Sequence, residues 1–172
     1  MFEVLFHMSN YRVLTLTEMH EIEQLSYFKA NTILVEAQTY LQRFNYDLAV
    51  RRAQEAFELF LKSLFQFLRT EYPASHDLKK QIYEELTVAF KRQQVDANQI
   101  TPLHIARVVL ANSVLHLWRS PAFYGDETLR VGSLFEESEA KLAVSYAELA
   151  RYLCMVVQRH AYQQATNAEV TS

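Results

Sequence analysis

The chain has 172 residues and a formal net charge of −3, and half of its residues are hydrophobic, so it is long and apolar enough for one domain with its own core. Only two glycines and three prolines occur, which argues against an all-β fold rich in hairpin turns, a Rossmann-type glycine motif or a P-loop. Abundant Leu, Ala, Glu, Gln and Arg favour helices instead. The single cysteine, Cys154, cannot form an internal disulfide framework and suits a cytoplasmic location.

The first residues, 1–16, are expected to form an N-terminal arm outside the main domain. Glu3, His7 and Arg12 interrupt its apolar character, so the arm does not have the continuous apolar stretch of a signal peptide. Nowhere in the chain do about eighteen apolar residues follow one another, so no membrane span is expected.

The next two segments have the clearest helical periodicity. Residues 17–44 are predicted to form the first helix, which opens with a capping box made by Thr15 and Glu18. Residues 46–72 are predicted to form the second, which Pro73 ends. The apolar positions expected to face the core are Ile33, Ala37, Tyr40, Leu41 and Phe44 in the first helix, and Ala49, Ala53, Ala56, Phe57, Phe60, Leu64, Phe67 and Leu68 in the second.

Two further helices are predicted over residues 76–94 and 101–118. Ser75 is expected to cap the former, and Thr101 followed by Pro102 is a favoured start for the latter. Residues 119–132 are expected to be a loop, because both glycines lie in it, and functional residues are frequent on such loops.

The last helix is predicted over residues 133–165, with a capping box from Ser133 to Glu136 and an alanine-rich face. Residues 166–172 are expected to be a disordered tail. Together the segments predict an all-α fold, an up-and-down antiparallel bundle of about five helices that spans residues 17–165, since most connections are short.

Several chemistries common in helical bundles are not expected. No histidine follows a glutamate by three residues, as a di-iron bundle requires. The histidines are scattered rather than paired, so no zinc site is expected. The sequence therefore predicts no metal and no cofactor.

Three motifs, in order, resemble those of the HEPN domain family. Residues 46–62 are similar to the family's signature helix, with a Gln-Glu-Ala at 54–56 and a Glu-x-x-x-Lys that ends at Lys62. Residues 73–78 read Pro-Ala-Ser-His-Asp-Leu, which resembles the connection into the family's next helix. Residues 119–125 read Arg-Ser-Pro-Ala-Phe-Tyr-Gly, similar to the family's Arg…Ala-x-Tyr-Gly segment, and an alanine-studded last helix follows. The resemblance covers roughly residues 17–160.

The resemblance implies a helical domain that forms a homodimer or pairs with a nucleotidyltransferase-type partner protein. Many HEPN proteins are ribonucleases, often in toxin–antitoxin or defence systems. Their chemistry needs no metal, because a histidine moves the proton of a ribose 2′-hydroxyl while an arginine stabilises charge on the phosphate.

The segment that matches the spacing of such a nuclease motif runs from Arg69 to His76, with six residues between them. These two residues are the candidate catalytic pair. The alternative interpretation is a helix end and a turn-capping residue, since the segment lies between the second and third helices rather than late in the domain.

A nucleotide or RNA could also be bound without cleavage. Lys62, Lys79 and Lys80 are candidates to meet near one end of the bundle, with Arg119 and Tyr124 supplying charge and a stacking ring. The alternative is that these cations form an ordinary solvated helix face, because the net charge of −3 gives no global basic footprint.

The sequence thus leaves three hypotheses. The first is a HEPN-type module, a homodimer or one partner of a complex, that binds a nucleotide, RNA or a protein. The alternative is a metal-independent ribonuclease that uses Arg69 and His76, and the second alternative is a purely structural docking bundle. Surplus aromatic residues, such as Tyr27, Phe28 and Trp118, are candidates for an apolar partner surface.

Overall fold

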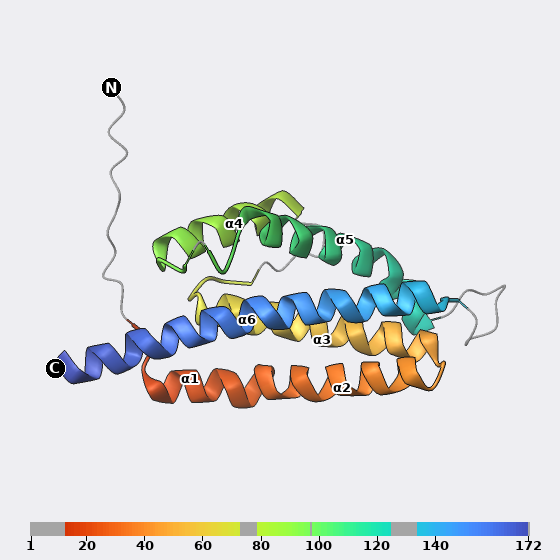
Figure 1. Cartoon of the computed structure of the whole chain (residues 1–172), viewed down its shortest axis with the longest axis horizontal. Coiled ribbons are helices and arrows are strands. Elements are labelled where there is room, and N and C mark those ends of the chain that lie inside the picture. The colour runs from red at the N-terminus through yellow and green to blue at the C-terminus, as the bar shows by residue number, and fades with distance from the viewer. Residues whose placement is uncertain (1–12, 73–78, 97, 125–133, 172) are drawn as a thin grey trace, which may run out of the picture.

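The structure, a computed structural model, describes residues 13–72, 79–96, 98–124 and 134–171. In these ranges the regular structure is entirely helical, as the sequence predicts. The elements are α1 (Leu16–Ile22), the π-helical turn η1 (Glu23–Tyr27), α2 (Phe28–Gln42), α3 (Tyr46–Phe67), α4 (Lys79–Arg92), α5 (Pro102–Tyr124) and α6 (Glu137–Thr171). Because α1, η1 and α2 follow one another as a single rod (Figure 1), the described chain forms five helical rods, which confirms the predicted bundle.

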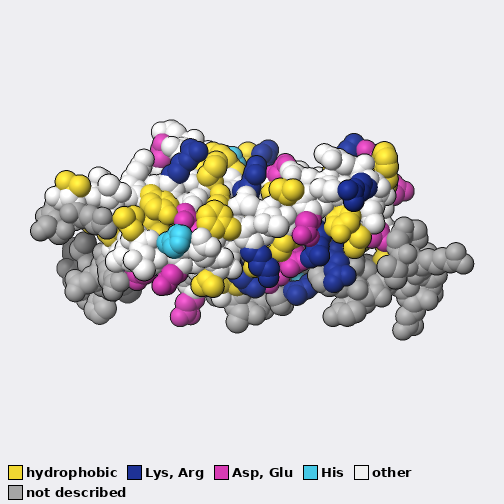
Figure 2. Space-filling model, turned by 90° about the horizontal axis from the view of Figure 1, so that it is seen from below, with side chains coloured by type: hydrophobic (Ala, Val, Ile, Leu, Met, Phe, Trp, Pro, Cys, Tyr) yellow, Lys and Arg dark blue, Asp and Glu magenta, His cyan; other side chains and the backbone are white. Residues whose placement is uncertain are grey.

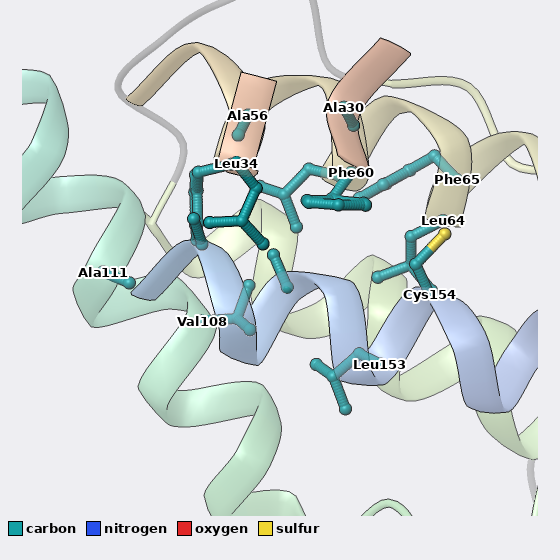
Figure 3. Packing of buried hydrophobic residues seen from close by; sticks show 14 of the residues in the cluster. Ala30, Leu34, Ala56, Phe60, Leu64, Phe65, Val108, Ala111, Leu153 and Cys154 are labelled. Atoms are coloured by element: carbon teal, nitrogen blue, oxygen red, sulfur yellow. The ribbon is translucent and has the colours of Figure 1, made fainter. Parts of the chain in front are cut away.

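The two central helices are α3 and α6, which pack along each other (Figure 1). The rod of α1 and α2 covers one side of this pair, and α4 with α5 covers the other. Figure 3 shows side chains such as Leu34, Phe60 and Cys154 meeting in the core between these layers.

The apolar faces predicted for the central helices are confirmed. All eight positions predicted for the second helix are buried in α3 or its cap. In α6 the small side chains of the alanine face are buried, which lets α3 approach closely. Cys154 is fully buried on the same face, and burial raises the pKa of its thiol well above the usual value.

The π-helical turn was not expected from the sequence. It coincides with a buried hydroxyl cluster, in which Ser63 Oγ donates to Ser26 Oγ at 2.7 Å and Ser26 Oγ donates to Gln66 Oε1 at 3.1 Å. The extra residue in the turn changes which side chains face inward, so that Tyr27 packs edge-on against Phe60 with ring centroids 5.8 Å apart. Polar side chains of η1 and α3 are therefore hydrogen-bonded to one another where α3 meets this rod.

Three helices end in the same way, with a residue other than glycine at positive φ directly after the helix cap. These residues are Phe44 (φ 59°), Arg69 (φ 53°) and Gln94 (φ 54°). In each case the two residues after the cap donate backbone hydrogen bonds to the last turn, the pattern of a Schellman motif.

These turns correct two expectations. The second helix ends at Phe67 rather than Tyr72, because the chain turns at Arg69. Phe44 was expected in the core, but it lies in the left-handed turn and is 76% exposed.

Two other ends also differ from the prediction. The helix expected to stop at 118 continues as α5 to Tyr124, so Arg119 lies in a helix and not in a loop. The tail expected from 166 onward is instead helical to Thr171 as part of α6.

Two helices begin where the capping residues in the sequence predict. The capping box of Thr15 and Glu18 is confirmed, and α5 begins at Pro102 as predicted. At the latter start the backbone N–H of Thr101 donates to His104 Nδ1 at 3.1 Å. The predicted caps Ser75 and Ser133 lie outside the described residues, as does most of the loop expected at 119–132.

Candidate functional site

A cleft of about 260 Å³ opens between α3 and α5. Both helices contribute polar and apolar side chains, and a tyrosine that follows α3 closes one end. The lining residues are Gln54, Glu55, Phe57 and Glu58 from α3, Tyr72, and Asn112, Leu115, His116 and Arg119 from α5.

Helical spacing explains why these residues share the cleft. Asn112, His116 and Arg119 follow one another at steps of four and three residues, so they lie along one side of α5. Glu58 and Lys62 are similarly one turn apart on α3. The cleft is therefore built from two helix faces that the packing of α3 against α5 brings together.

An ionic cluster stands at the mouth of the cleft. Glu58 Oε1 lies 2.9 Å from Lys62 Nζ, and Glu58 Oε2 lies 3.9 Å from Arg119 Nη1. The two cations are half-exposed, with side-chain exposures of 43% for Lys62 and 46% for Arg119. Exposed pairs of this kind contribute at most about 1 kcal/mol each, so the cluster matters more for the charge it holds at the cleft than for stability.

Tyr72 forms the wall beside this cluster. Its ring packs edge-on against Phe65 with centroids 5.4 Å apart, and Lys62 Nζ lies 5.9 Å from its centroid. Burial, together with the negative charge of Glu58, raises the pKa of Tyr72 to about 12, although Arg119 acts in the opposite direction. At neutral pH Tyr72 is therefore a protonated hydroxyl next to two cations.

Gln54 fixes the deeper part of the cleft. Its Nε2 donates to the backbone carbonyl of Leu115 at 2.6 Å, which ties α3 to α5. Its Oε1 is buried and has no hydrogen-bond partner among the described residues.

The charge balance of the lining is close to neutral. Glu55 pairs with Arg52 at 2.8 Å, and Arg52 also lies 3.1 Å from Glu36. The carboxylate of Glu55 is thus held by a cation outside the lining, while Glu58 is shared by the two cations at the mouth. The lining therefore includes two carboxylates, Glu55 and Glu58, and each of them is paired with a cation.

Of the predicted binding residues, the structure brings Lys62 and Arg119 together through Glu58. The backbones of Lys79 and Lys80 begin α4 and that of Tyr124 ends α5, but their side chains lie outside the description.

The predicted catalytic pair has a different placement. Arg69 occupies the left-handed turn at the end of α3 and is half-buried, and the following Thr70 donates its backbone N–H to the carbonyl of Phe65. This matches the alternative interpretation of Arg69 as a helix-end residue. His76 lies outside the described residues.

Sequence reasoning missed His116 because it looked for a histidine after Arg119, whereas His116 precedes it by one helical turn. It also missed Gln54, Glu55, Glu58 and Asn112. Their helical spacing was visible, but nothing in the sequence showed that these two faces meet.

Among the described residues no group of three or more His, Cys, Asp or Glu side chains is placed to hold a metal ion. In the same part of the chain, none of the helices has the length and apolar character needed to cross a membrane.

In comparison with known families, the model of the HEPN domain matches residues 24–155. No curated protein and no solved structure matches the chain. The matched range runs from η1 into α6 and contains every residue that lines the cleft. Since the match covers well over half of the chain, the protein belongs to the HEPN domain family.

Proposed function

We propose that this protein is a HEPN module that binds a nucleotide or a short RNA segment in the cleft between α3 and α5. The observation that carries the proposal is the cluster of Lys62, Glu58 and Arg119 beside Tyr72 at the mouth of the cleft. Two half-exposed cations can contact a phosphate, and the neighbouring aromatic ring can pack against a base.

The geometry favours a small ligand. The cleft holds about 260 Å³, and the carboxylates of Glu55 and Glu58 line it together with the cation of Arg119. A long nucleic acid would meet these carboxylates and a protein with a net charge of −3, which supports binding by local contacts rather than by a broad positive field.

A second candidate function is metal-independent RNA cleavage. The observation that favours it is that His116 and Arg119 both line the cleft and lie one helical turn apart. An imidazole can move the proton of a ribose 2′-hydroxyl, and a guanidinium can stabilise charge on the phosphate. In this hypothesis His116 and Arg119 on α5 take the catalytic roles predicted for His76 and Arg69. The pair of Arg69 and His76 remains a prediction and is tested in the same experiment.

Binding is tested by fluorescence anisotropy with a labelled RNA oligonucleotide and with ATP and GTP as competitors. Arg119→Ala and Lys62→Ala should each weaken binding roughly tenfold, as expected when one charged contact to phosphate is lost. Arg107→Ala is the matched control, because Arg107 is an exposed arginine on α5 that does not line the cleft. If all three variants bind like the wild type, the cleft is not the binding site.

Cleavage is tested with the purified protein in EDTA. Loss of activity in His116→Ala and Arg119→Ala, but not in Arg69→Gly or His76→Ala, would assign the reaction to the cleft. The opposite pattern would return it to the pair predicted from the sequence. If the wild type leaves RNA intact, the ribonuclease hypothesis fails, and a binding or docking module remains.

The proposal also concerns the oligomeric state of the protein and the cellular system in which it acts. A homodimer or a pair with a nucleotidyltransferase-type partner, in a toxin–antitoxin or defence system in the cytoplasm, is consistent with membership of the HEPN family. The buried Cys154 thiol agrees with a reducing compartment.

A further inference from the structure

Gln54 places a buried amide in the lining of the cleft between α3 and α5. The residue is 7% exposed. Its Nε2 donates to the backbone carbonyl of Leu115 at 2.6 Å, whereas its Oε1 has no hydrogen-bond partner in the described part of the chain. Most buried polar atoms in folded proteins are hydrogen-bonded, so an unpaired acceptor in the lining of a cleft points to a donor on the ligand.

The contact with Leu115 determines which way this amide is turned. If the amide were turned over, Oε1 would face the carbonyl oxygen of Leu115, and the two acceptors would repel each other. The unpaired atom of Gln54 is therefore the oxygen, which accepts a hydrogen bond from an N–H and disfavours a carbonyl. A ligand that lacks the donor leaves this buried acceptor unpaired, and this makes such a site selective.

The amide lies one helical turn from the arginine of the cleft. Four residues separate Gln54 from Glu58 on α3, and four separate Leu115 from Arg119 on α5, which is about 6 Å along each helix. Gln54 contacts Leu115, and Glu58 pairs with Arg119, so the two contacts follow each other along the boundary between the helices. A nucleotide whose phosphate contacts Arg119 can therefore present the edge of its base to Gln54.

We infer that Gln54 selects nucleotides whose base carries the amino group of adenine or cytosine, by accepting an N–H of that group at Oε1. Contacts of Arg119 and Lys62 with a phosphate do not distinguish one base from another. Gln54 does, because guanine and uracil carry a carbonyl in place of that amino group and would bring two acceptors together. This inference rests on the proposed function, since it assigns the base specificity of the same cleft.

Access to the amide depends on the side chains around it, because Oε1 has almost no exposed surface of its own. Asn112 and His116 line the cleft from α5, and they are half-buried and exposed, respectively. We expect a ligand to reach Oε1 by turning such side chains aside, a motion that exposed side chains make within nanoseconds.

The experiment is isothermal titration calorimetry on the full chain with nucleotides that differ by the amino group alone. AMP is paired with purine riboside monophosphate, and CMP with pyrimidin-2-one riboside monophosphate, in which a hydrogen atom replaces the amino group. In at least one pair, the amino nucleotide should bind the wild type roughly tenfold more tightly. Equal affinities within both pairs would overturn the inference, and this comparison needs no variant to fold.

Gln54→Met tests whether this residue recognises the amino group. Methionine has a similar length and no oxygen, so the preference within the pair should fall below about twofold. Gln38→Met is the matched control, because Gln38 lies on α2 and does not line the cleft, and it should keep the full preference. Circular dichroism checks that both variants are folded. A folded Gln54→Met that keeps the preference would overturn the inference.

Arg119→Ala distinguishes a failure of this inference from a failure of the proposed function. It should weaken both nucleotides of a pair roughly tenfold and leave the preference between them unchanged, because it removes a contact to the phosphate. Weaker binding by Arg119→Ala together with equal wild-type affinities within each pair would overturn the inference alone. If Arg119→Ala binds like the wild type, or if the wild type binds none of the four nucleotides, both are overturned.

Discussion

Two helices that line the same cleft, α3 and α5, differ in what their outward sides carry. α3 buries a continuous face that includes Phe60 and Leu64 and carries charged residues such as Glu58 and Lys62 away from the core. α5 buries Val108 on one side and exposes leucines on the other. Figure 2 shows charged residues mixed with small hydrophobic areas on a further face of the molecule, that of α1 and α2 seen from below.

The difference shows which helix has its apolar surface covered by the described chain and which helix leaves apolar surface exposed. The amphipathic pattern of α3 is satisfied inside one chain, because its apolar side is covered and its charged side is hydrated. The pattern of α5 leaves apolar area in water, which costs free energy unless a partner covers it. The comparison therefore separates apolar residues that stabilise the fold through burial from apolar residues that remain exposed.

The largest expected effect tests this separation directly. Phe60→Ala removes a fully buried ring from the centre of the core and should lower the free energy of unfolding by about 3–5 kcal/mol. Leu110→Ala should change the stability of the monomer by less than about 0.5 kcal/mol, because its side chain is 57% exposed. Urea unfolding at a concentration where the protein is monomeric measures both. Equal losses in the two variants would contradict the comparison.

The pH dependence of the folding stability gives a second test, which concerns Tyr72 in the lining of the cleft. Burial raises the pKa of Tyr72 from about 10 in the unfolded chain to about 12 in the fold, so its neutral form is favoured by folding. The resulting stability is fully present below pH 10 and is lost as the pH rises from about 10 to about 12.

Tyr72→Phe should flatten this alkaline loss of stability, measured as urea midpoints at several pH values. In a spectrophotometric titration of the folded protein, the same substitution should remove one late-ionising tyrosine. A Tyr72 that ionises at about pH 10 in the fold would show that the cleft wall is hydrated.

The next effect concerns how α3 is tied to the start of α6. The backbone N–H of Phe135 donates to Asp47 Oδ1 at 3.1 Å, and this contact is buried. Asp47→Ala should lower the free energy of unfolding by about 1–3 kcal/mol, because it leaves a buried N–H without its acceptor. Glu137→Ala, at an exposed residue of α6, is the control and should have little effect. Thermal unfolding monitored by circular dichroism distinguishes the two.

The smallest effect concerns the turns that flank the helices. Gln94→Gly should raise the free energy of unfolding by about 1 kcal/mol, since glycine adopts positive φ without the steric cost that glutamine carries there. Gln94→Ala keeps that cost and should not stabilise the protein. For the same reason Arg69→Gly is the better variant for testing the catalytic role of Arg69, because it removes the side chain without straining the turn.

Much of the fold was predictable because it depends on local patterns. The three- and four-residue spacing of Ala49, Ala53 and Phe60 identified the buried side of α3, and the capping box at Thr15 identified the start of α1. Helix ends were less predictable, because the chain has few glycines and uses residues such as Phe44 and Arg69 in left-handed turns.

The cleft was predictable only in part. Lys62 and Arg119 were candidates from their place in family-like motifs, but their meeting through Glu58 joins residues far apart in the sequence. His116 was overlooked because the expected motif placed a histidine after the arginine.

By itself the sequence determined an all-helical chain with the motifs of a HEPN domain, because helix formation depends on periodicity, propensity and caps within a few turns. Only the tertiary structure decided which helix faces meet and which do not. It brought Glu58 to Arg119 and left Leu110 in water, because packing α3 against α6 and α5 determines which side chains are covered. Two apolar sides of α5 thereby have different surroundings, one in the core and one exposed to solvent.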